Sequence, residues 1–234
     1  MRVAIVENTR ITHHGQVGVA LHEAGALVDL WRPFADQRLP EGPDGFDALV
    51  VFGGEQSAVD DSLHPYLPRL AALMRQASAA GKAVLGICLG SQILARGYGA
   101  ENRLGTAPEF GWVKVAQTAA GRDDPIFGGV GAEFPIFQWH SDTFTLPNGA
   151  QQLASSTGAA QQCFRIGRAG YGMQFHFEAS RAVVADWTRT FPEATERMQP
   201  GWVADHPKAS ASDGRVADAA GLQIARNWVA MIQP

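Results

Sequence analysis

One cysteine lies between two glycines where an apolar run of the chain gives way to a helical pattern. Residues 83–87 are apolar or glycine, Cys88 follows them, and an amphipathic stretch begins at residue 91. A strand that turns at once into a helix strains the backbone at the turn, and Gly86 and Gly90 remove side chains that would clash there. The side chain then projects over the carboxyl end of a sheet, at a helix N-terminus that favours a thiolate. This pattern predicts a nucleophile elbow; the alternative is a buried structural cysteine.

Short apolar runs alternate with amphipathic stretches through the first hundred residues. Strands are expected at residues 3–6, 27–31, 48–52 and 82–88, and helices at 16–24, 65–80 and 91–98. Strands that alternate with helices predict a mostly parallel sheet with helices on both faces, and so an α/β fold.

The pattern changes beyond residue 105. Strand-like runs with little helix between them follow at residues 112–117, 133–139, 152–155, 162–167 and 171–175. They predict an antiparallel extension of the same sheet. From residue 181 the chain is helical again, with residues 208–214 as the expected connection before the last helix. A chain of 234 residues favours one domain, 1–234, with a catalytic core at 1–190 and a helical extension at 191–234.

Composition and charge exclude several classes of function. A net charge of −4 gives no basic surface for nucleic acid. No apolar stretch approaches the ~20 residues needed to span a bilayer, and charge appears at Glu7, too early for a secretory signal. Two cysteines, Cys88 and Cys163, do not make a disulfide framework. We therefore expect a cytoplasmic protein that binds neither membrane nor nucleic acid.

A cysteine nucleophile needs a base, and the base needs a group that orients it. His176 and Glu178 are two residues apart at the end of a strand-like run. Alternate residues of an extended chain face the same way, so the carboxylate can hold the imidazole with its other nitrogen toward Cys88. The alternative is a histidine and a glutamate that serve only the rim of the sheet.

Gly53 and Gly54 directly follow an expected strand. Glycines let backbone N–H groups approach a ligand closely. The amides of Gly54 and Leu89 could therefore form an oxyanion hole for a tetrahedral intermediate. A plain turn at the strand end is the alternative.

Taken together, these segments resemble class I glutamine amidotransferases over about residues 1–190. The motifs that carry the resemblance are the nucleophile motif at 86–92, the oxyanion strand at 52–54 and the histidine–glutamate motif at 174–178. Residues 109–112, 139–144 and 171–176 are similar to the stand-alone branch related to the amidotransferase of GMP synthase. The resemblance implies a flavodoxin-like fold.

The resemblance also implies hydrolysis of a γ-glutamyl amide through a γ-glutamyl thioester on Cys88, without a cofactor. His176 would move the protons and Glu178 would orient it. Gln92 matches the position that contacts the amino and carboxylate end of the substrate. Gly53, His140 and Ser141 would complete the substrate site. No metal is expected, because the histidines and cysteines lack ligand spacing.

Two positions depart from the family pattern. Phe177 stands between the histidine and the glutamate where proline is common, which leaves the orientation of the pair to packing. Glu55 and Gln56 follow Gly54 where proline is usual, which predicts a less rigid oxyanion loop.

Three functions remain open at this level. The chain can hydrolyse γ-glutamyl amides alone, or it can be a glutaminase subunit that passes ammonia to a separate synthetase. The chain has no P-loop signature for ATP, and this favours autonomous hydrolysis slightly. The third function is a non-catalytic redox or binding protein, against which the full set of Cys88, His176 and Glu178 argues.

Overall fold

The computed structural model describes residues 1–233, and none of the helices in this range is both long and apolar enough to cross a bilayer. The first half of the chain contains β1 (Arg2–Val6), α1 (Gly15–Glu23), β2 (Leu27–Trp31), α2 (Pro33–Asp36), β3 (Ala48–Val51), α3 (Leu67–Ala79), β4 (Ala83–Ile87), α4 (Leu89–Gly97), β5 (Asn102–Arg103) and β6 (Glu109–Gln117). The second half contains α5 (Ala119–Asp123), the 3₁₀ turn η1 (Pro125–Phe127), β7 (Glu133–His140), β8 (Thr143–Phe144), β9 (Gln151–Ser155), β10 (Cys163–Ile166), β11 (Gly170–Met173), α6 (Arg181–Thr190), α7 (Pro192–Met198), α8 (Trp202–Ala211) and α9 (Asp213–Ala230).

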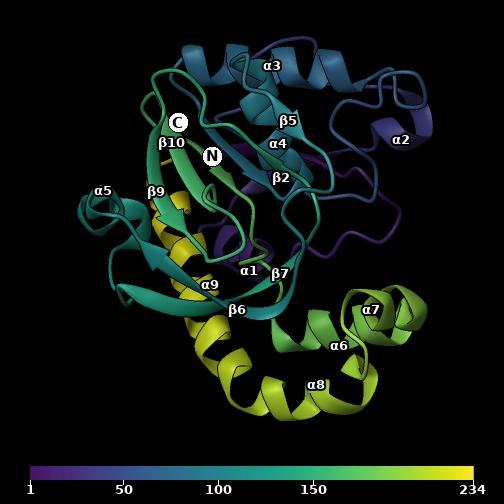
Figure 1. The fold of residues 1–234 in the computed structure, drawn as a ribbon. Coiled ribbons are helices and arrows are strands. Elements are labelled where there is room, and N and C mark those ends of the chain that lie inside the picture. The colour runs from purple at the N-terminus through teal and green to yellow at the C-terminus, as the bar shows by residue number, and fades with distance from the viewer. Residues whose placement is uncertain (234) are drawn as a thin grey trace.

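A nine-stranded sheet runs through the molecule in the order β2-β1-β3-β4-β11-β10-β9-β6-β7 (Figure 1). The strands from β2 to β11 in this order are parallel, and those from β10 to β7 pair antiparallel. Strands β5 and β8 form a separate pair. The predicted α/β fold, a mostly parallel sheet with an antiparallel extension, is therefore confirmed.

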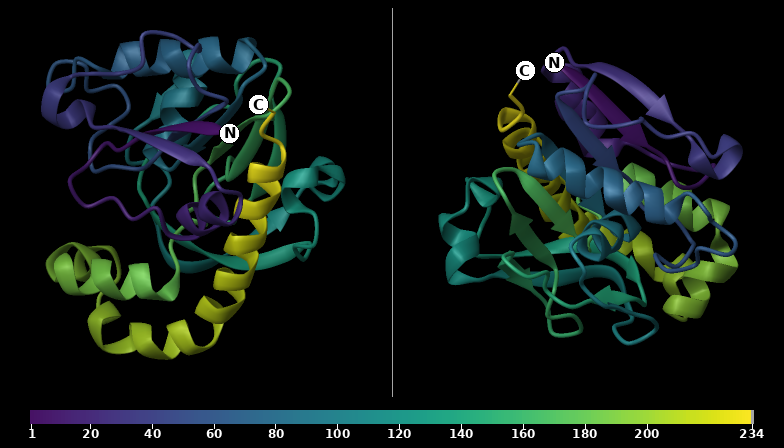
Figure 2. Two further views of the ribbon diagram at one scale, coloured as in Figure 1. Left: turned by 180° about the vertical axis from the view of Figure 1, so that it is seen from behind. Right: turned by 90° about the horizontal axis from the view of Figure 1, so that it is seen from above.

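Alternate residues of the central strands pack into two different cores. In β1, Val3 and Ile5 face one core, whereas Ala4 and Val6 face the other. Helices α1 and α9 cover the first core, and α3 and α4 cover the second. Figure 2 shows α9 running along the sheet on the side away from α3. Helices on both faces explain why the central parallel strands β3, β4 and β11 are buried along their whole length.

The C-terminal helices pack against the sheet by aromatic contacts. Trp202 of α8 is buried beside Phe137 of β7, and its indole N–H donates a hydrogen bond to Thr188 Oγ1 at 2.9 Å.

The prediction of a connection at residues 208–214 is wrong, since α8 extends to Ala211 and α9 begins at Asp213. The buried Trp202 anchors α8, and this tertiary contact outweighs the loop-like composition.

Helix α9 returns to the core that contains β1, to which it contributes Ala217, Ile224 and Trp228. On the basis of this packing we propose that residues 1–234 form a single domain. Residue 234 itself lies outside the described range. The division at residue 190 likewise stays a prediction.

Two glycines lie against the backbone of the turn after β11 that contains the histidine–glutamate pair. A Cβ on Gly221 of α9 would lie far inside van der Waals contact of the Phe177 carbonyl oxygen. A Cβ on Gly15, which has φ +47°, would overlap the Glu178 carbonyl oxygen in the same way. The neighbouring Gln16 N–H donates to that oxygen at 2.9 Å. Helices α1 and α9 therefore both fix the backbone at residues 177 and 178.

We predict that Gly15→Ala destabilises the fold more than Gly25→Ala does. Both glycines have positive φ, but a Cβ on Gly25 meets nothing within 4 Å. The left-handed backbone alone should cost about 1–2 kcal/mol, and overlap with Glu178 should add about 1–3 kcal/mol. Denaturant unfolding of both variants measures the difference, and equal losses would contradict the close approach.

Candidate active site

Cys88 occupies a strained turn between β4 and α4. Its φ is +51° and its ψ is −110°, and Gln37 is the only other non-glycine residue with positive φ within residues 1–233. A Cβ on Gly86 would overlap the Gly90 carbonyl, and a Cβ on Gly90 would overlap the carbonyl of Val51 in β3. The strained turn expected from the sequence is present, and both glycines are needed for it.

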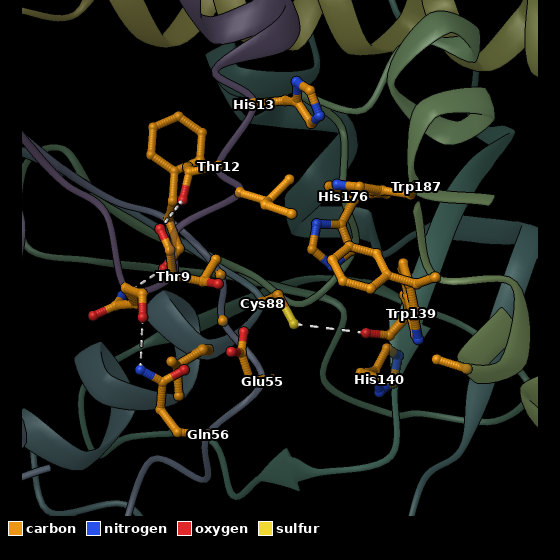
Figure 3. A pocket seen from close by; sticks show the side chains of 18 of the residues that line it. Thr9, Thr12, His13, Glu55, Gln56, Cys88, Trp139, His140, His176 and Trp187 are labelled. Carbon is orange, nitrogen blue, oxygen red and sulfur yellow. Dashed lines mark hydrogen bonds between the residues drawn. The ribbon is translucent and has the colours of Figure 1, made fainter. Parts of the chain in front are cut away.

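The turn places the Cys88 sulfur inside a cavity of about 820 Å³ at the carboxyl ends of the parallel strands (Figure 3). The Cys88 N–H donates to the Met173 carbonyl at 2.8 Å, which ties the turn to the end of β11. Its Sγ lies 3.8 Å from the Trp139 carbonyl oxygen, and the residue is 7% exposed. The thiol is therefore held at the wall of the cavity.

His176 and Glu178 form a buried pair beside this cysteine. Glu178 Oε1 lies 2.7 Å from His176 Nδ1, so the other ring nitrogen remains free to face Cys88. The His176 N–H donates to the Phe137 carbonyl at 2.8 Å. His176 Cε1 and Cys88 Cβ lie 3.3 and 3.4 Å from the point that a Cβ on Gly53 would occupy. The structure thus brings the three predicted catalytic residues together.

The charge state of His176 follows from its neighbours. Burial lowers the pKa of the imidazole, but the Glu178 carboxylate and then the Cys88 sulfur more than offset this, and the pKa rises to about 10. The ring is then protonated at neutral pH. Because the pKa is raised above its ordinary 6.5, the charged ring contributes stability that is complete below about pH 6.5 and is lost as pH rises through about 10.

The predicted oxyanion loop follows β3 and is held by side chains. Gln56 Nε2 donates to the Asn8 carbonyl at 2.9 Å and to the Tyr66 hydroxyl at 2.7 Å. Asn8 Nδ2 donates to the Phe52 carbonyl at 2.7 Å. These bonds fix the loop without the usual proline. Among the backbone–backbone hydrogen bonds outside the helices and strands of residues 1–233, none is donated by the amide of Gly54 or of Leu89.

The predicted substrate residues border the same cavity. The Gln92 amide donates to Gln174 Oε1 at 3.1 Å, and Ser141 is half-buried at the cavity wall. The His140 ring is buried, with Nδ1 3.1 Å from the Asp142 carbonyl and Nε2 3.2 Å from Glu109 Oε2. Both ring nitrogens of His140 therefore face protein atoms. This arrangement fits a residue that positions the cavity wall better than one that contacts a ligand directly.

All nine predicted site residues line one cavity: Cys88, His176, Glu178, Gly53, Gly54, Leu89, Gln92, His140 and Ser141. Within residues 1–233 no group of three or more histidine, cysteine, aspartate and glutamate side chains is placed to hold a metal ion.

Sequence reasoning missed several residues of the cavity. They belong to the loop after β1 and to the C-terminal helices, and include Thr9, Arg10, Thr12, Trp187, Phe191, Ala194 and Met198. His13 of the same loop also lines the cavity, with Nε2 2.8 Å from Asp186 Oδ2. Thr9, Arg10 and Thr12 could have been found from the sequence, because their loop follows β1 and therefore lies at the carboxyl edge of the sheet.

Comparison with known families matches residues 16–184 to the model described as glutamine amidotransferase class-I. The chain belongs to this family. It is 34% identical over 181 residues to the glutamine amidotransferase-like protein YfeJ of Salmonella typhimurium, covering 76% of each chain. It is 33% identical over 137 residues to one subunit of the glutamine-hydrolyzing GMP synthase of Thermoplasma acidophilum, covering 58% of this chain and 64% of that one.

Solved structures of the family share the fold. A glutamine amidotransferase from Thermotoga maritima aligns with a TM-score of 0.87 at 24% identity, over 100% of this chain and 98% of that one. One from Methylobacillus flagellatus aligns with a TM-score of 0.84 at 27% identity, over 99% of this chain and 95% of that one.

Phe177 stands where the sequence departs from the expected motif. Its ring is buried, with its centroid 6.3 Å from that of Phe175. His176 and Glu178, on either side of it, still lie 2.7 Å apart between Nδ1 and Oε1.

We predict that Glu178→Gln lowers the pKa of His176 from about 10, because it removes the carboxylate whose charge raises it most. An NMR titration of the imidazole carbons measures the midpoint. Glu193→Gln, at an exposed position of α7, is the matched control and should leave the midpoint unchanged. A midpoint near 6.5 in the parent protein, or no change in Glu178→Gln, would contradict the coupling.

Proposed function

We propose that the protein hydrolyses a γ-glutamyl amide through a γ-glutamyl thioester on Cys88. The observation that carries this proposal is the placement of Cys88 and the buried His176–Glu178 pair against the same glycine, Gly53, in one cavity. A nucleophile, a proton-transfer group and its orienting carboxylate are the parts that acyl transfer requires. Membership of the amidotransferase family supports this chemistry.

The reaction would begin from a thiolate beside a protonated His176. Sγ attacks the γ-carbonyl carbon, and the oxygen that becomes negative lies toward the amides of Gly54 and Leu89. When the carbon–nitrogen bond breaks, His176 gives its proton to the leaving nitrogen. The neutral ring then takes a proton from water, which attacks the thioester and releases glutamate. Glu178 holds the ring in place throughout.

The γ-glutamyl group would occupy the part of the cavity near α4. Gln92 lies one turn beyond the nucleophile, and Ser141 lies in the segment after β7. Gly53 lets the ligand approach the backbone, and His140 holds the segment of Asp142 in position. Losing one oxyanion donor would cost about 10²–10³ in rate, so this region carries a large part of catalysis.

A second function is favoured by the relatives that are named as separate subunits of a glutamine-hydrolyzing GMP synthase. In this alternative the chain is a glutaminase subunit, and the ammonia passes to a separate synthetase. The match covers 64% of the Thermoplasma acidophilum subunit and between 24% and 31% of five relatives that are named GMP synthase without mention of a subunit.

We predict that Cys88→Ala and His176→Ala each reduce hydrolysis by about 10³-fold or more, since the members of such a unit act together. Glu178→Gln should lose less, because the imidazole remains. Cys163→Ala is the matched control: this cysteine is buried in β10, and burial raises the pKa of its thiol well above the usual range. Ammonia or amine release from glutamine and γ-glutamyl dipeptides measures the losses. Turnover by Cys88→Ala would refute the proposal.

The same assay separates the two functions. Release from γ-glutamyl dipeptides by the protein alone supports autonomous hydrolysis. Release from glutamine only after a synthetase is added supports the role of a glutaminase subunit. Without turnover in either case, oxidation of Cys88 by peroxide would indicate a redox protein.

A further inference from the structure

The cavity extends past the catalytic residues along an apolar surface, which we call the aromatic wall. It consists of Trp139 of β7, Trp187 of α6, Phe191 between α6 and α7, and Ala194 and Met198 of α7. Figure 3 shows Trp139 and Trp187 on the same side of Cys88 as His176. Four of the five residues lie beyond residue 184, where the family match ends, so no catalytic motif assigns them a role.

The aromatic wall begins at the catalytic histidine and leads outward. Trp187 packs edge-on against His176 with ring centroids 5.3 Å apart. Trp139 contacts Trp187 at 5.7 Å and Phe191 at 6.1 Å, both in edge-to-face geometry. The two tryptophans are half-buried, and Phe191 is 37% exposed. Apolar side chains that remain open to a concave site are typical of a ligand-binding surface.

The direction of proton transfer identifies which part of the substrate meets this wall. His176 must give its proton to the leaving nitrogen, so the leaving group lies on the His176 side of the sulfur. The Gly54 and Leu89 amides take the oxyanion, and Gln92 lies in α4 on the acyl side. The aromatic wall therefore borders the leaving group. Ammonia would make no use of it, and about 820 Å³ is within the roughly 300–1,000 Å³ range of sites for larger ligands.

Charge near the aromatic wall favours an uncharged leaving group. None of its five side chains is charged. Ionisable groups of α6 and of the loop after β1 are engaged with one another, since Asp186 contacts both His13 and Arg189. Apart from histidines, the charged residues that line the cavity are Arg10, Glu55, Asp142 and Glu178, and none of them belongs to α6 or α7. Asp142 Oδ1 accepts a hydrogen bond from the Gly105 amide, and Glu178 is paired with His176. A charged amine or a carboxylate on the leaving group would find no partner on the wall.

We propose that the aromatic wall is a leaving-group subsite, and that the substrate is a γ-glutamyl amide of an apolar alkyl or aryl amine. This inference rests on the proposed function. Sγ bonds to the γ-carbonyl carbon, the carbon–nitrogen bond breaks, and the amine leaves with the proton of His176. Water then supplies one proton to His176 and a hydroxyl to the acyl carbon, which gives glutamate and restores the thiolate.

The test compares kcat/KM of the full chain for glutamine, γ-glutamyl-n-pentylamide and γ-glutamyl-4-aminobutylamide. The last two leaving groups have similar length, but the aminobutyl group carries an ammonium. Because a methylene in an apolar pocket is worth about 10-fold or more, the pentylamide should exceed both other substrates by at least ~10-fold. Release of glutamate gives the same readout for all three.

The variant Ala194→Phe tests the position of the subsite, because Ala194 belongs to the aromatic wall and a larger side chain there would fill space that the leaving group needs. It should lower the ratio of kcat/KM for the pentylamide to that for glutamine by ~10-fold or more. Arg197→Ala, at an exposed position of the same helix, is the matched control and should keep the parent ratio. Thermal unfolding of both variants checks that the fold is retained.

The outcomes are distinguishable. If glutamine is hydrolysed but the pentylamide is no better, or the aminobutylamide is best, the subsite is overturned and the proposed function stands. An unchanged ratio in Ala194→Phe also overturns it. If no γ-glutamyl amide is hydrolysed and a diazo-ketone glutamine analogue leaves Cys88 unlabelled, the proposed function itself fails.

Discussion

The left-handed backbone at Cys88 is the constraint on which the rest of the site depends. It exists because Gly86 and Gly90 allow β4, α4 and β3 to approach one another without side chains between them. A residue with φ +51° is strained, and the hydrogen bond from its amide to Met173 at the end of β11 helps to retain it. The strain fixes the sulfur at the edge of the sheet, where the strand that leads to His176 also ends.

The second half of the site is held by parts of the chain that are distant in sequence. Gly15 of α1 and Gly221 of α9 contact the backbone of Glu178 and Phe177, and the His176 amide bonds to β7. The buried carboxylate keeps the pKa of the imidazole high, at about 10. Packing on the segment after β11 thus holds the His176–Glu178 pair in place, and helices α6 and α7 close one side of the cavity.

Local sequence rules predicted the elbow, because it depends on the geometry of a few consecutive residues. The pairing of His176 with Glu178 was also predicted, but it is made in a turn after the end of β11 and not by the alternation of side chains along an extended strand. The alternation of strands with helices and the antiparallel extension also followed from hydrophobic runs. The aromatic wall could not be predicted in this way. An amphipathic helix shows that one face is buried, but the periodicity around Trp187 does not say which surface it covers. The helical state of residues 208–211 depends on the anchoring of Trp202, which is a tertiary contact.

Direct detection of the covalent intermediate tests the central claim, that this strained cysteine is the attacking group. The protein is mixed with a γ-glutamyl amide, and the reaction is quenched in acid during turnover. The protein is then digested, and the masses of the peptides are measured by mass spectrometry. The account predicts one γ-glutamyl group on the peptide that contains Cys88, sensitive to hydroxylamine as a thioester is, and an unmodified Cys163. Turnover without any adduct on Cys88, or with the adduct on another residue, would contradict it.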